Sequence, residues 1–255
     1  MKLKSYSSYC LLGLCLLTAF LFTQPTTSKD FVSSGQTTIK HSLVDLLGKS
    51  TATQFQKITD IHKTQQWQVY LPTNELTKPP GLFVYVSPVK TGQITQEWKR
   101  VMDKHNLIYI AADAAGNWTK PNHRIVMAIN AVPAAMRQWS INKNRIIISG
   151  FSGGGRIASM LAIQYPNIFS SALYICGVNY WEESWQPDMD KLTSHRFVFF
   201  TGTNDFNLGQ TRDIHTRYLK AGLKNSKLLV ANRTAHELPN ANYLNLALSY
   251  LLINN

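Results

Sequence analysis

The sequence predicts an α/β fold, with a mostly parallel, doubly wound sheet and helices on both of its faces. Two observations carry this prediction. Short continuous apolar runs, which are typical of buried parallel strands, alternate with longer segments whose apolar residues recur at helical spacing. One such run, residues 146–148, passes through a glycine-rich turn directly into a helical pattern.

The expected elements follow in chain order. Residues 31–59 are polar and are expected to form an entry segment with little regular structure. Residues 62–71 alternate loosely between apolar and polar and stop at Pro72, which predicts an antiparallel edge strand. Further strands are expected at residues 82–86, 107–112, 146–148, 171–176, 197–201 and 227–230. Helices are expected at residues 94–106, 124–139, 207–223 and 240–252, with one more directly after the glycine-rich turn.

Residues 1–28 have the features of a signal peptide. Lys2 and Lys4 precede an uninterrupted apolar run at residues 10–22, which is short for a bilayer span and suits export. Cleavage is expected after Ser28, with an uncleaved anchor as the alternative. The remaining residues, 29–255, suit one large α/β domain. The protein is therefore expected to be secreted or periplasmic.

The chain is strongly basic and has few cysteines. Its net charge is +12, with 26 Lys and Arg against 14 Asp and Glu, so weak association with an anionic envelope surface is expected. The basic residues are scattered and form no stripe, so no nucleic-acid partner is expected. Because Cys10 and Cys15 lie in the predicted signal peptide, Cys176 would stand alone after cleavage, which excludes an intramolecular disulfide.

Residues 150–154, Gly-Phe-Ser-Gly-Gly, fit the G-x-S-x-G pattern that places a serine nucleophile on a sharp turn between a strand and a helix. Gly150 and Gly154 lack the Cβ atoms that would collide in such a turn. Ser152 is therefore the predicted nucleophile. The backbone N–H of Gly153, at the positive end of the following helix, is the first predicted oxyanion donor. The alternative is a glycine-rich turn with no chemistry.

Two further residues complete a predicted catalytic triad. A serine hydroxyl needs a neutral imidazole to take its proton and a carboxylate to orient that imidazole. Among the acidic residues after Ser152, only Asp205 directly follows a strong predicted strand. His236 lies between the last predicted strand and the last helix, where the base is expected. The alternatives are a helix-capping aspartate and a surface-loop histidine.

The second oxyanion donor is expected in the loop that follows the strand at residues 82–86. Pro88 has no N–H, so Val89 is the expected donor, with Ser87 as an alternative through its backbone or hydroxyl. No cofactor and no metal are expected, because the chain has no H-E-x-x-H motif, no pair of cysteines outside the leader and no Walker lysine.

Four aromatic residues are candidates for the substrate pocket: Trp118, Tyr180, Trp181 and Trp185. The last three lie in a short insert, residues 178–194, which is too short for a full lid. The alternative is that they pack a small cap against the core.

The motifs together resemble those of the α/β-hydrolase superfamily, and most closely its secreted polyhydroxybutyrate depolymerase and feruloyl-esterase-like branch. The segments that carry this resemblance are GFSGGGRIASML at residues 150–161, TGTND at 201–205 and AHELP at 235–239. The resemblance implies a single α/β-hydrolase domain that hydrolyses carboxylic esters through an acyl-enzyme, with small acyl, aryl or polyester substrates. The loop SPVKTG at residues 87–92 departs from the family's usual His-Gly. The alternatives are a peptidase or thioesterase on the same triad, and a non-catalytic envelope-binding module on a hydrolase scaffold.

Overall fold

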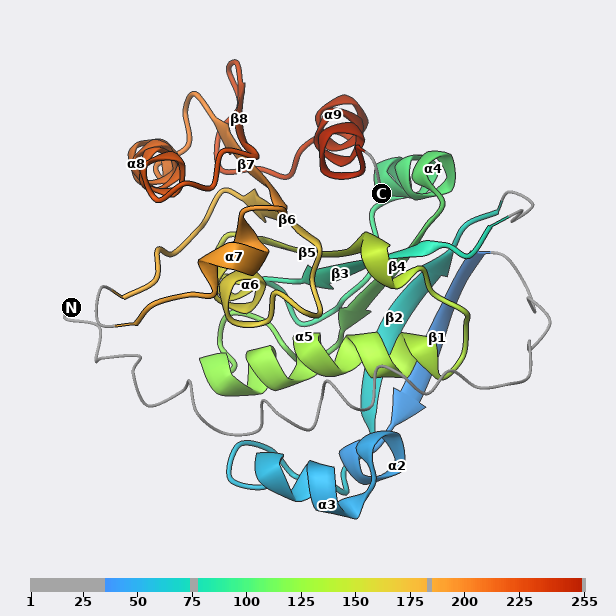
Figure 1. Ribbon diagram of the computed structural model, residues 1–255. Coiled ribbons are helices and arrows are strands. Elements are labelled where there is room, and N and C mark those ends of the chain that lie inside the picture. The colour runs from blue at the N-terminus through green and yellow to red at the C-terminus, as the bar shows by residue number, and fades with distance from the viewer. Residues whose placement is uncertain (1–34, 74–77, 183–184, 254–255) are drawn as a thin grey trace.

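The computed structural model describes residues 35–73, 78–182 and 185–253, which build an eight-stranded sheet (Figure 1). The strands are β1 (Gly35–His41), β2 (Gln65–Leu71), β3 (Gly81–Val86), β4 (Leu107–Ala112), β5 (Ile146–Phe151), β6 (Ser171–Ile175), β7 (Arg196–Gly202) and β8 (Ser226–Ala231). Their order in the sheet is β1-β2-β4-β3-β5-β6-β7-β8. From β4 to β8 all neighbours are parallel, whereas β2 runs antiparallel to β4 and to β1. The predicted mostly parallel sheet is confirmed; the predicted signal peptide lies outside the described residues.

Helices cover both faces of the sheet, as predicted (Figure 1). They are α2 (Leu43–Leu47), α3 (Lys49–Ala52), α4 (Gln96–His105), α5 (Pro121–Met136), α6 (Gly153–Gln164), α7 (Met189–Leu192), α8 (Leu208–Lys220) and α9 (Ala241–Leu251), with 3-10 turns η2 (Thr53–Phe55) and η3 (Lys143–Arg145). Helices α4 and α9 pack together on one face, and α5, α6 and α8 pack on the other. Within the described ranges, no helix combines the length and the apolar character that a membrane crossing requires.

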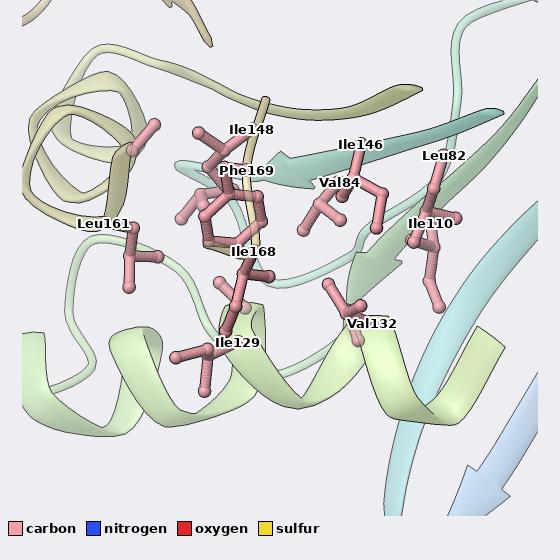
Figure 2. Packing of buried hydrophobic residues seen from close by; sticks show 14 of the residues in the cluster. Leu82, Val84, Ile110, Ile129, Val132, Ile146, Ile148, Leu161, Ile168 and Phe169 are labelled. Atoms are coloured by element: carbon pink, nitrogen blue, oxygen red, sulfur yellow. The ribbon is translucent and has the colours of Figure 1, made fainter. Parts of the chain in front are cut away.

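The central strands are apolar throughout because successive side chains enter two different cores. Val84 of β3 and Ile148 of β5 face Val132 of α5, in the core shown in Figure 2. Phe83, one residue earlier in β3, points to the opposite face and meets the ring of Trp98 of α4 edge-on, with ring centroids 6.2 Å apart. All of these side chains are buried, so the sheet forms a rigid platform for the loops at its carboxyl edge.

The expectation that residues 31–59 have little regular structure is wrong for the part that the structure describes. Strand β1 pairs antiparallel with β2 along its whole length, from Gly35 opposite Leu71 to His41 opposite Gln65. The predicted strand at residues 62–71 is therefore antiparallel as expected, but β1, not β2, forms the edge. The sequence contained little indication of this strand because only Ile39 of β1 is buried, and the other residues of this outer strand are mostly polar.

Helix α2 was missed for a related reason, since it has only five residues. Its start is nevertheless marked in the sequence, because the hydroxyl oxygen of Ser42 accepts a hydrogen bond from the N–H of Asp45 at 3.0 Å. The buried side of the helix consists of Leu43, Leu46 and Leu47. A capping serine followed by this leucine pattern is the signal that could have found the helix.

Helix α6 begins unusually close to the sheet, and glycines make this approach sterically feasible. A Cβ atom on Gly154 would stand 1.9 Å from the carbonyl oxygen of Val86 in β3. A Cβ atom on Gly150 would stand 2.4 Å from the carbonyl oxygen of Gly154. Both contacts are with backbone, which cannot move aside as a flexible side chain can. The predicted reason for glycine at these two positions is thus confirmed.

We expect Gly154→Ala to lower the free energy of unfolding by about 1–3 kcal/mol or more, because the added methyl group overlaps the end of β3. The matched control is Gly209→Ala in α8, where an added Cβ would meet nothing within 4 Å. The control should raise stability by about 0.5–1 kcal/mol, since alanine is the better helix former. Urea denaturation of both variants measures the difference. Equal stabilities would contradict the steric argument.

Candidate active site

Ser152 occupies the strained turn between β5 and α6. Its φ of 57° and ψ of −120° lie outside the regions that L-residues ordinarily adopt. Its N–H donates to the carbonyl oxygen of Ile175 at 2.8 Å, and its own carbonyl oxygen accepts from the N–H of Arg156 at 3.2 Å, which starts α6. Gly177 packs against it so closely that a Cβ there would stand 2.2 Å from the Ser152 carbonyl oxygen. The predicted strand, turn and helix are therefore all present, with Ser152 at the helix N-terminus.

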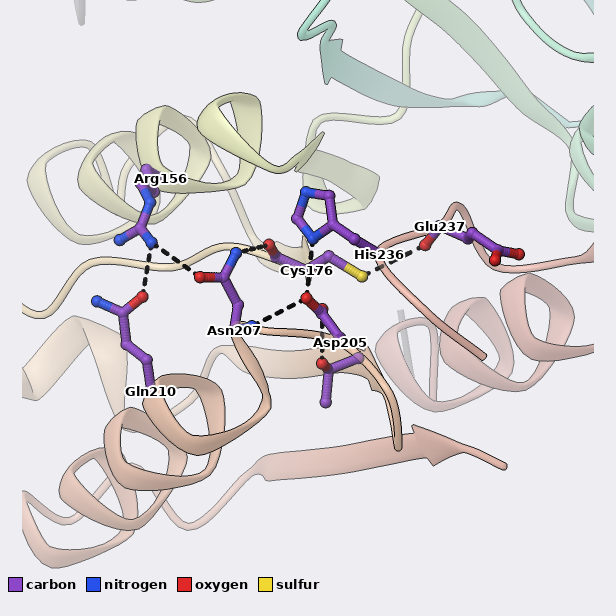
Figure 3. Close-up of polar contacts among 8 residues, drawn as sticks. Arg156, Cys176, Asp205, Asn207, Gln210, His236 and Glu237 are labelled. Atoms are coloured by element: carbon purple, nitrogen blue, oxygen red, sulfur yellow. Dashed lines mark hydrogen bonds and ion pairs between the residues drawn. The ribbon is translucent and has the colours of Figure 1, made fainter. Parts of the chain in front are cut away.

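Asp205 and His236 lie together at the same edge of the sheet (Figure 3). Nδ1 of His236 is 2.8 Å from Oδ1 of Asp205. The Asp205 carboxylate is buried, and it also accepts from the N–H of Asn207 at 2.9 Å and from the hydroxyl of Thr201 at 2.8 Å. Burial raises the pKa of Asp205, but the hydrogen bonds from Asn207, Cys176, His236 and Thr201 outweigh burial and leave its pKa below the usual value. The carboxylate is therefore ionised at neutral pH and holds the imidazole in one orientation.

Two phenylalanines flank the imidazole of His236. Phe206 stacks on it with ring centroids 4.2 Å apart, and Phe151 lies 4.9 Å from it. Since Phe151 directly precedes Ser152, the histidine lies beside the serine turn. Because Nδ1 is bonded to Asp205, Nε2 is the ring nitrogen left to exchange a proton with a hydroxyl. The structure thus brings Asp205 and His236, from the loops after β7 and β8, into direct contact, and it places His236 against Phe151, the residue before Ser152.

A polar network behind the triad links the serine helix to the aspartate loop (Figure 3). Asn207 donates through Nδ2 to the carbonyl oxygen of Cys176 at 2.7 Å and accepts from Arg156 at 3.3 Å. Arg156, one turn into α6, also donates to Oε1 of Gln210 at 2.6 Å and to Oδ1 of Asn179 at 3.0 Å. The sequence analysis missed this network. Its members share no motif, and only the position of Asn207, two residues after Asp205, indicated a role.

Cys176 lies against the Asp205–His236 pair. Its thiol donates to the carbonyl oxygen of Glu237 at 3.3 Å, and its Sγ, an Asp205 oxygen and a His236 ring nitrogen all lie within 4.8 Å of one another. Among the described residues, these three side chains form a group close enough to hold a metal ion. Burial raises the pKa of the Cys176 thiol well above its usual value, which favours the protonated thiol over a metal-binding thiolate. The cluster as built is a hydrogen-bonding one.

The loop after β3 uses its own predicted oxyanion donors internally. The Ser87 hydroxyl donates to the carbonyl oxygen of Thr91 at 2.8 Å and accepts from the N–H of Val89 at 3.2 Å. Either group would have to exchange this contact to serve an oxyanion. A residue that the sequence did not predict contacts Gly153 directly, because a Cβ on Gly153 would stand 2.3 Å from Oδ1 and 3.2 Å from Nδ2 of Asn117. The Asn117 amide therefore lies directly over the residue that follows the nucleophile.

The candidate pocket aromatics separate into two groups. Trp118 is 70% exposed on the loop after β4, next to Asn117. Tyr180 and Trp181 instead stack on each other at 3.9 Å, and Trp181 lies 5.3 Å from the buried ring of Tyr218 in α8. Trp185 likewise packs against the core. These contacts favour the alternative of a small cap packed on the core for the three residues of the insert; a pocket role for them stays a prediction.

Comparisons with known proteins fit this geometry at the level of the fold. No protein-family model and no curated protein matches the sequence. Solved structures do match: a ferulic acid esterase at 15% identity and a TM-score of 0.62, covering 88% of this chain and 100% of that one. S-formylglutathione hydrolase from Staphylococcus aureus matches at 13% identity and a TM-score of 0.60, covering 85% of this chain and 95% of that one. The fold is the α/β-hydrolase fold. A fluorophosphonate-binding serine hydrolase of the same organism, with substrate bound, shares it at 11% identity and a TM-score of 0.59, covering 88% of this chain and 100% of that one.

We expect Asp205→Asn to lower kcat for the reaction proposed below by about 10⁴-fold, because an amide favours the wrong imidazole tautomer. The variant should also change the acid stability. Since the pKa of Asp205 is lowered in the folded state, its charge stabilises the protein fully above the unfolded-state pKa of 3.8, and this stabilisation is lost as pH falls through the lower folded pKa.

Urea denaturation at several pH values tests the second expectation. The difference in unfolding free energy between the wild type and Asp205→Asn should be constant near neutral pH and shrink below about pH 4. Asp190→Asn on the exposed face of α7 is the control and should match the wild type throughout. A difference that grows on acidification would contradict the assignment.

The network behind the triad gives a second expectation. Asn207→Ala should lower kcat by about tenfold, because it releases the Asp205 loop from Cys176 and from Arg156. Gln210→Ala removes another Arg156 contact without touching the aspartate loop, and should leave kcat within about twofold. Steady-state kinetics of the two variants side by side would reveal whether the link to Asp205 matters. Equal losses would contradict it.

Proposed function

We propose that this protein is a serine esterase that cleaves carboxylic esters through an acyl-enzyme, with Ser152 as nucleophile, His236 as general base and Asp205 as the orienting acid. One observation carries the proposal. A serine in a strained strand-to-helix turn lies beside a histidine whose Nδ1 is bonded at 2.8 Å to a buried carboxylate. This is the arrangement that activates a hydroxyl, and neither a binding surface nor a structural turn requires it.

The proposed reaction follows from these positions. Oγ of Ser152 attacks the ester carbonyl carbon while Nε2 of His236 takes the hydroxyl proton, and Asp205 stabilises the imidazolium that forms. The oxygen that becomes negatively charged accepts a hydrogen bond from the N–H of Gly153 and is stabilised by the positive end of α6. His236 then protonates the departing alkoxide, which leaves the acyl group on Ser152. Water, deprotonated by His236, then attacks the acyl carbonyl carbon; the bond to Oγ of Ser152 breaks, His236 returns the proton to Oγ, and the acid is released.

The surroundings of the triad support a substrate with an apolar part. Three large hydrophobic side chains are exposed on loops at the carboxyl edge of the sheet, namely Val89 at 50%, Trp118 at 70% and Phe206 at 79%. Phe206 lies on the imidazole itself, and Trp118 follows Asn117, which covers Gly153. Exposed aromatic groups around a polar reaction centre suit aryl, acyl or polyester substrates. The fold neighbours named as ferulic acid esterase and S-formylglutathione hydrolase are, by their names, hydrolases of an ester of an aromatic acid and of a thioester, and the first of these fits a substrate with an apolar part.

The finer assignments belong to the same proposal. We place the protein in the secreted polyhydroxybutyrate depolymerase and feruloyl-esterase-like branch on the motifs at residues 150–161, 201–205 and 235–239. We place it outside the cytoplasm, secreted or periplasmic, on the basic and apolar leader at residues 1–28. The net charge of +12 supports weak association with anionic envelope surfaces.

Hydrolysis of p-nitrophenyl acetate, butyrate and octanoate by the purified protein tests the proposal. Ser152→Ala should lower kcat by about 10⁶-fold, since the hydroxyl that forms the acyl-enzyme is gone. The wild type should also be labelled covalently by a fluorophosphonate, and the variant should not. The chain-length profile of the wild type would show how much apolar substrate the exposed rim accepts.

Equal background rates in the folded wild type and in Ser152→Ala would contradict the esterase proposal. Labelling of Ser152 without ester hydrolysis would favour a peptidase or thioesterase on the same triad. Neither labelling nor hydrolysis would favour a binding module on a hydrolase scaffold.

A further inference from the structure

Arg124 is a buried cation whose hydrogen bonds all go to backbone carbonyls. It lies in the first turn of α5 and is only 4% exposed. Its Nε donates to the carbonyl oxygen of Ala115 at 2.9 Å, one terminal nitrogen to that of Ser87 at 3.1 Å, and the other to that of Gly153 at 3.3 Å. Among the residues that the structure describes, the ion pairs involve other side chains, and Arg124 faces no carboxylate.

Burying a positive charge without an anion is costly, so this arrangement calls for a physical reason. Burial lowers the pKa of Arg124 to about 10, which still leaves the guanidinium charged at neutral pH. Three carbonyl dipoles offset part of the desolvation cost but do not neutralise the charge. A net positive charge therefore persists under this part of the surface.

The three carbonyls belong to the three segments that surround the expected oxyanion position. Gly153 follows the nucleophile, Ser87 begins the loop that contains Val89, and Ala115 lies two residues before Asn117. These segments also contact one another, since the N–H of Asn117 donates to the carbonyl oxygen of Pro88 at 2.9 Å. Because a peptide unit is planar, each carbonyl that Arg124 holds also fixes the plane of its own peptide group and so restrains the segment around it.

We propose that Arg124 is the positioning residue of the oxyanion hole: its guanidinium holds the loops after β3 and β4 and the start of α6 in register, and its uncompensated charge favours an anion on their outer side. The inference rests on the proposed esterase function and goes beyond it by naming the group that organises this site. Arg124 lies behind the backbone and does not touch the substrate, so it acts through the segments that it holds and through its field.

This role also gives a physical reason for the unusual loop sequence. The loop SPVKTG has Pro88, which lacks an N–H, where an oxyanion donor is expected. The N–H of Val89 donates a hydrogen bond to the hydroxyl oxygen of Ser87. A loop of this kind needs to be held from behind. The bond from Arg124 to the carbonyl oxygen of Ser87 supplies that support, and the bond to Ala115 does the same for the segment that carries Asn117.

The experiment compares Arg124→Met and Arg124→Lys with a matched control, Arg145→Met. Arg145 is half-buried and also donates to a backbone carbonyl, that of His105 at 2.7 Å, but it lies just before β5, at the opposite end of the strand from Ser152. Three quantities are measured for each folded protein. They are kcat and KM for p-nitrophenyl butyrate, and the inhibition constant of phenylboronic acid, which serines bind as a tetrahedral anion.

Arg124→Met should lower kcat by about 10- to 100-fold, somewhat less than the loss of a direct oxyanion donor, while KM changes by less than about twofold. Boronate affinity should fall in parallel with kcat, because both report on the anionic tetrahedral state. Arg124→Lys should recover part of the loss, because it keeps the charge but cannot reach three carbonyls at once. Arg145→Met should leave kcat and boronate affinity within about twofold of the wild type.

An unchanged kcat in folded Arg124→Met would overturn the inference, as would a purely KM effect or an equal loss of kcat in Arg145→Met. If Arg124→Met does not fold, the test uses Arg124→Lys instead. A kcat and a boronate affinity equal to those of the wild type in Arg124→Lys would overturn the inference. Failure of the esterase proposal is distinguishable. A wild type that neither hydrolyses esters nor reacts with a fluorophosphonate overturns both, whereas an active wild type with an inactive Ser152→Ala and an active Arg124→Met overturns only this inference.

Discussion

The structure depends on one close approach of backbone to backbone, at the point where β5 turns into α6. Ser152 can adopt its strained conformation because Gly154 lets the helix start against the end of β3 and Gly177 leaves room for the Ser152 carbonyl. The strain is held by hydrogen bonds on both sides, to Ile175 in β6 and from Arg156 in α6. Larger side chains at these glycines would push the helix away and relax the turn. The strained conformation of Ser152 is therefore a property of the packed sheet and not of the pentapeptide alone.

The charges around that turn are arranged in two opposite ways. On one side, Asp205 is a buried anion bonded to Thr201, Asn207 and His236, which keep it ionised and fix the imidazole of His236. On the other side, Arg124 is a buried cation bonded only to carbonyls. A negative group next to His236 and a positive group behind Gly153 match the charge separation that the proposed attack of Ser152 on a carbonyl would produce. The two sides are carried by different elements and meet at α6.

The hydrogen bonds of Arg156 connect helix α6 to the loop of Asp205 and to the insert. They reach from the serine helix to Asn207 in the aspartate loop and to Asn179 in the insert. The insert itself packs by aromatic stacking on α8, where Arg217 lies over the ring of Tyr180 at 3.7 Å. The aspartate loop is thus held between the serine helix and the insert. A displacement of any one of these three parts would therefore also displace Asp205.

The sequence by itself determined the parallel strands and predicted the three residues of the proposed triad. Continuous apolar runs such as β3 and β4 can only be buried on both faces, and the glycine pattern around Ser152 is typical of a tight strand-to-helix turn that exposes a nucleophile. Asp205 and His236 were found because each follows a strand, and parallel strands bring their carboxyl ends to one edge. Apolar runs, glycine spacing and positions after strands are all visible within short stretches of the sequence, so these features could be predicted without a structure.

Tertiary structure decided everything that depends on a partner distant in the chain. Strand β1 is polar in sequence and becomes a strand only through its pairing with β2. The positions of Tyr180 and Trp181 depend on the ring of Tyr218 in α8, against which both pack. Arg124 and Asn117 belong to no sequence motif. The carbonyls that Arg124 binds lie 9 to 37 residues away in the chain. Asn117 contacts Gly153, which lies on another element. A side chain whose function is to hold other segments in place can be recognised only when those segments are seen around it.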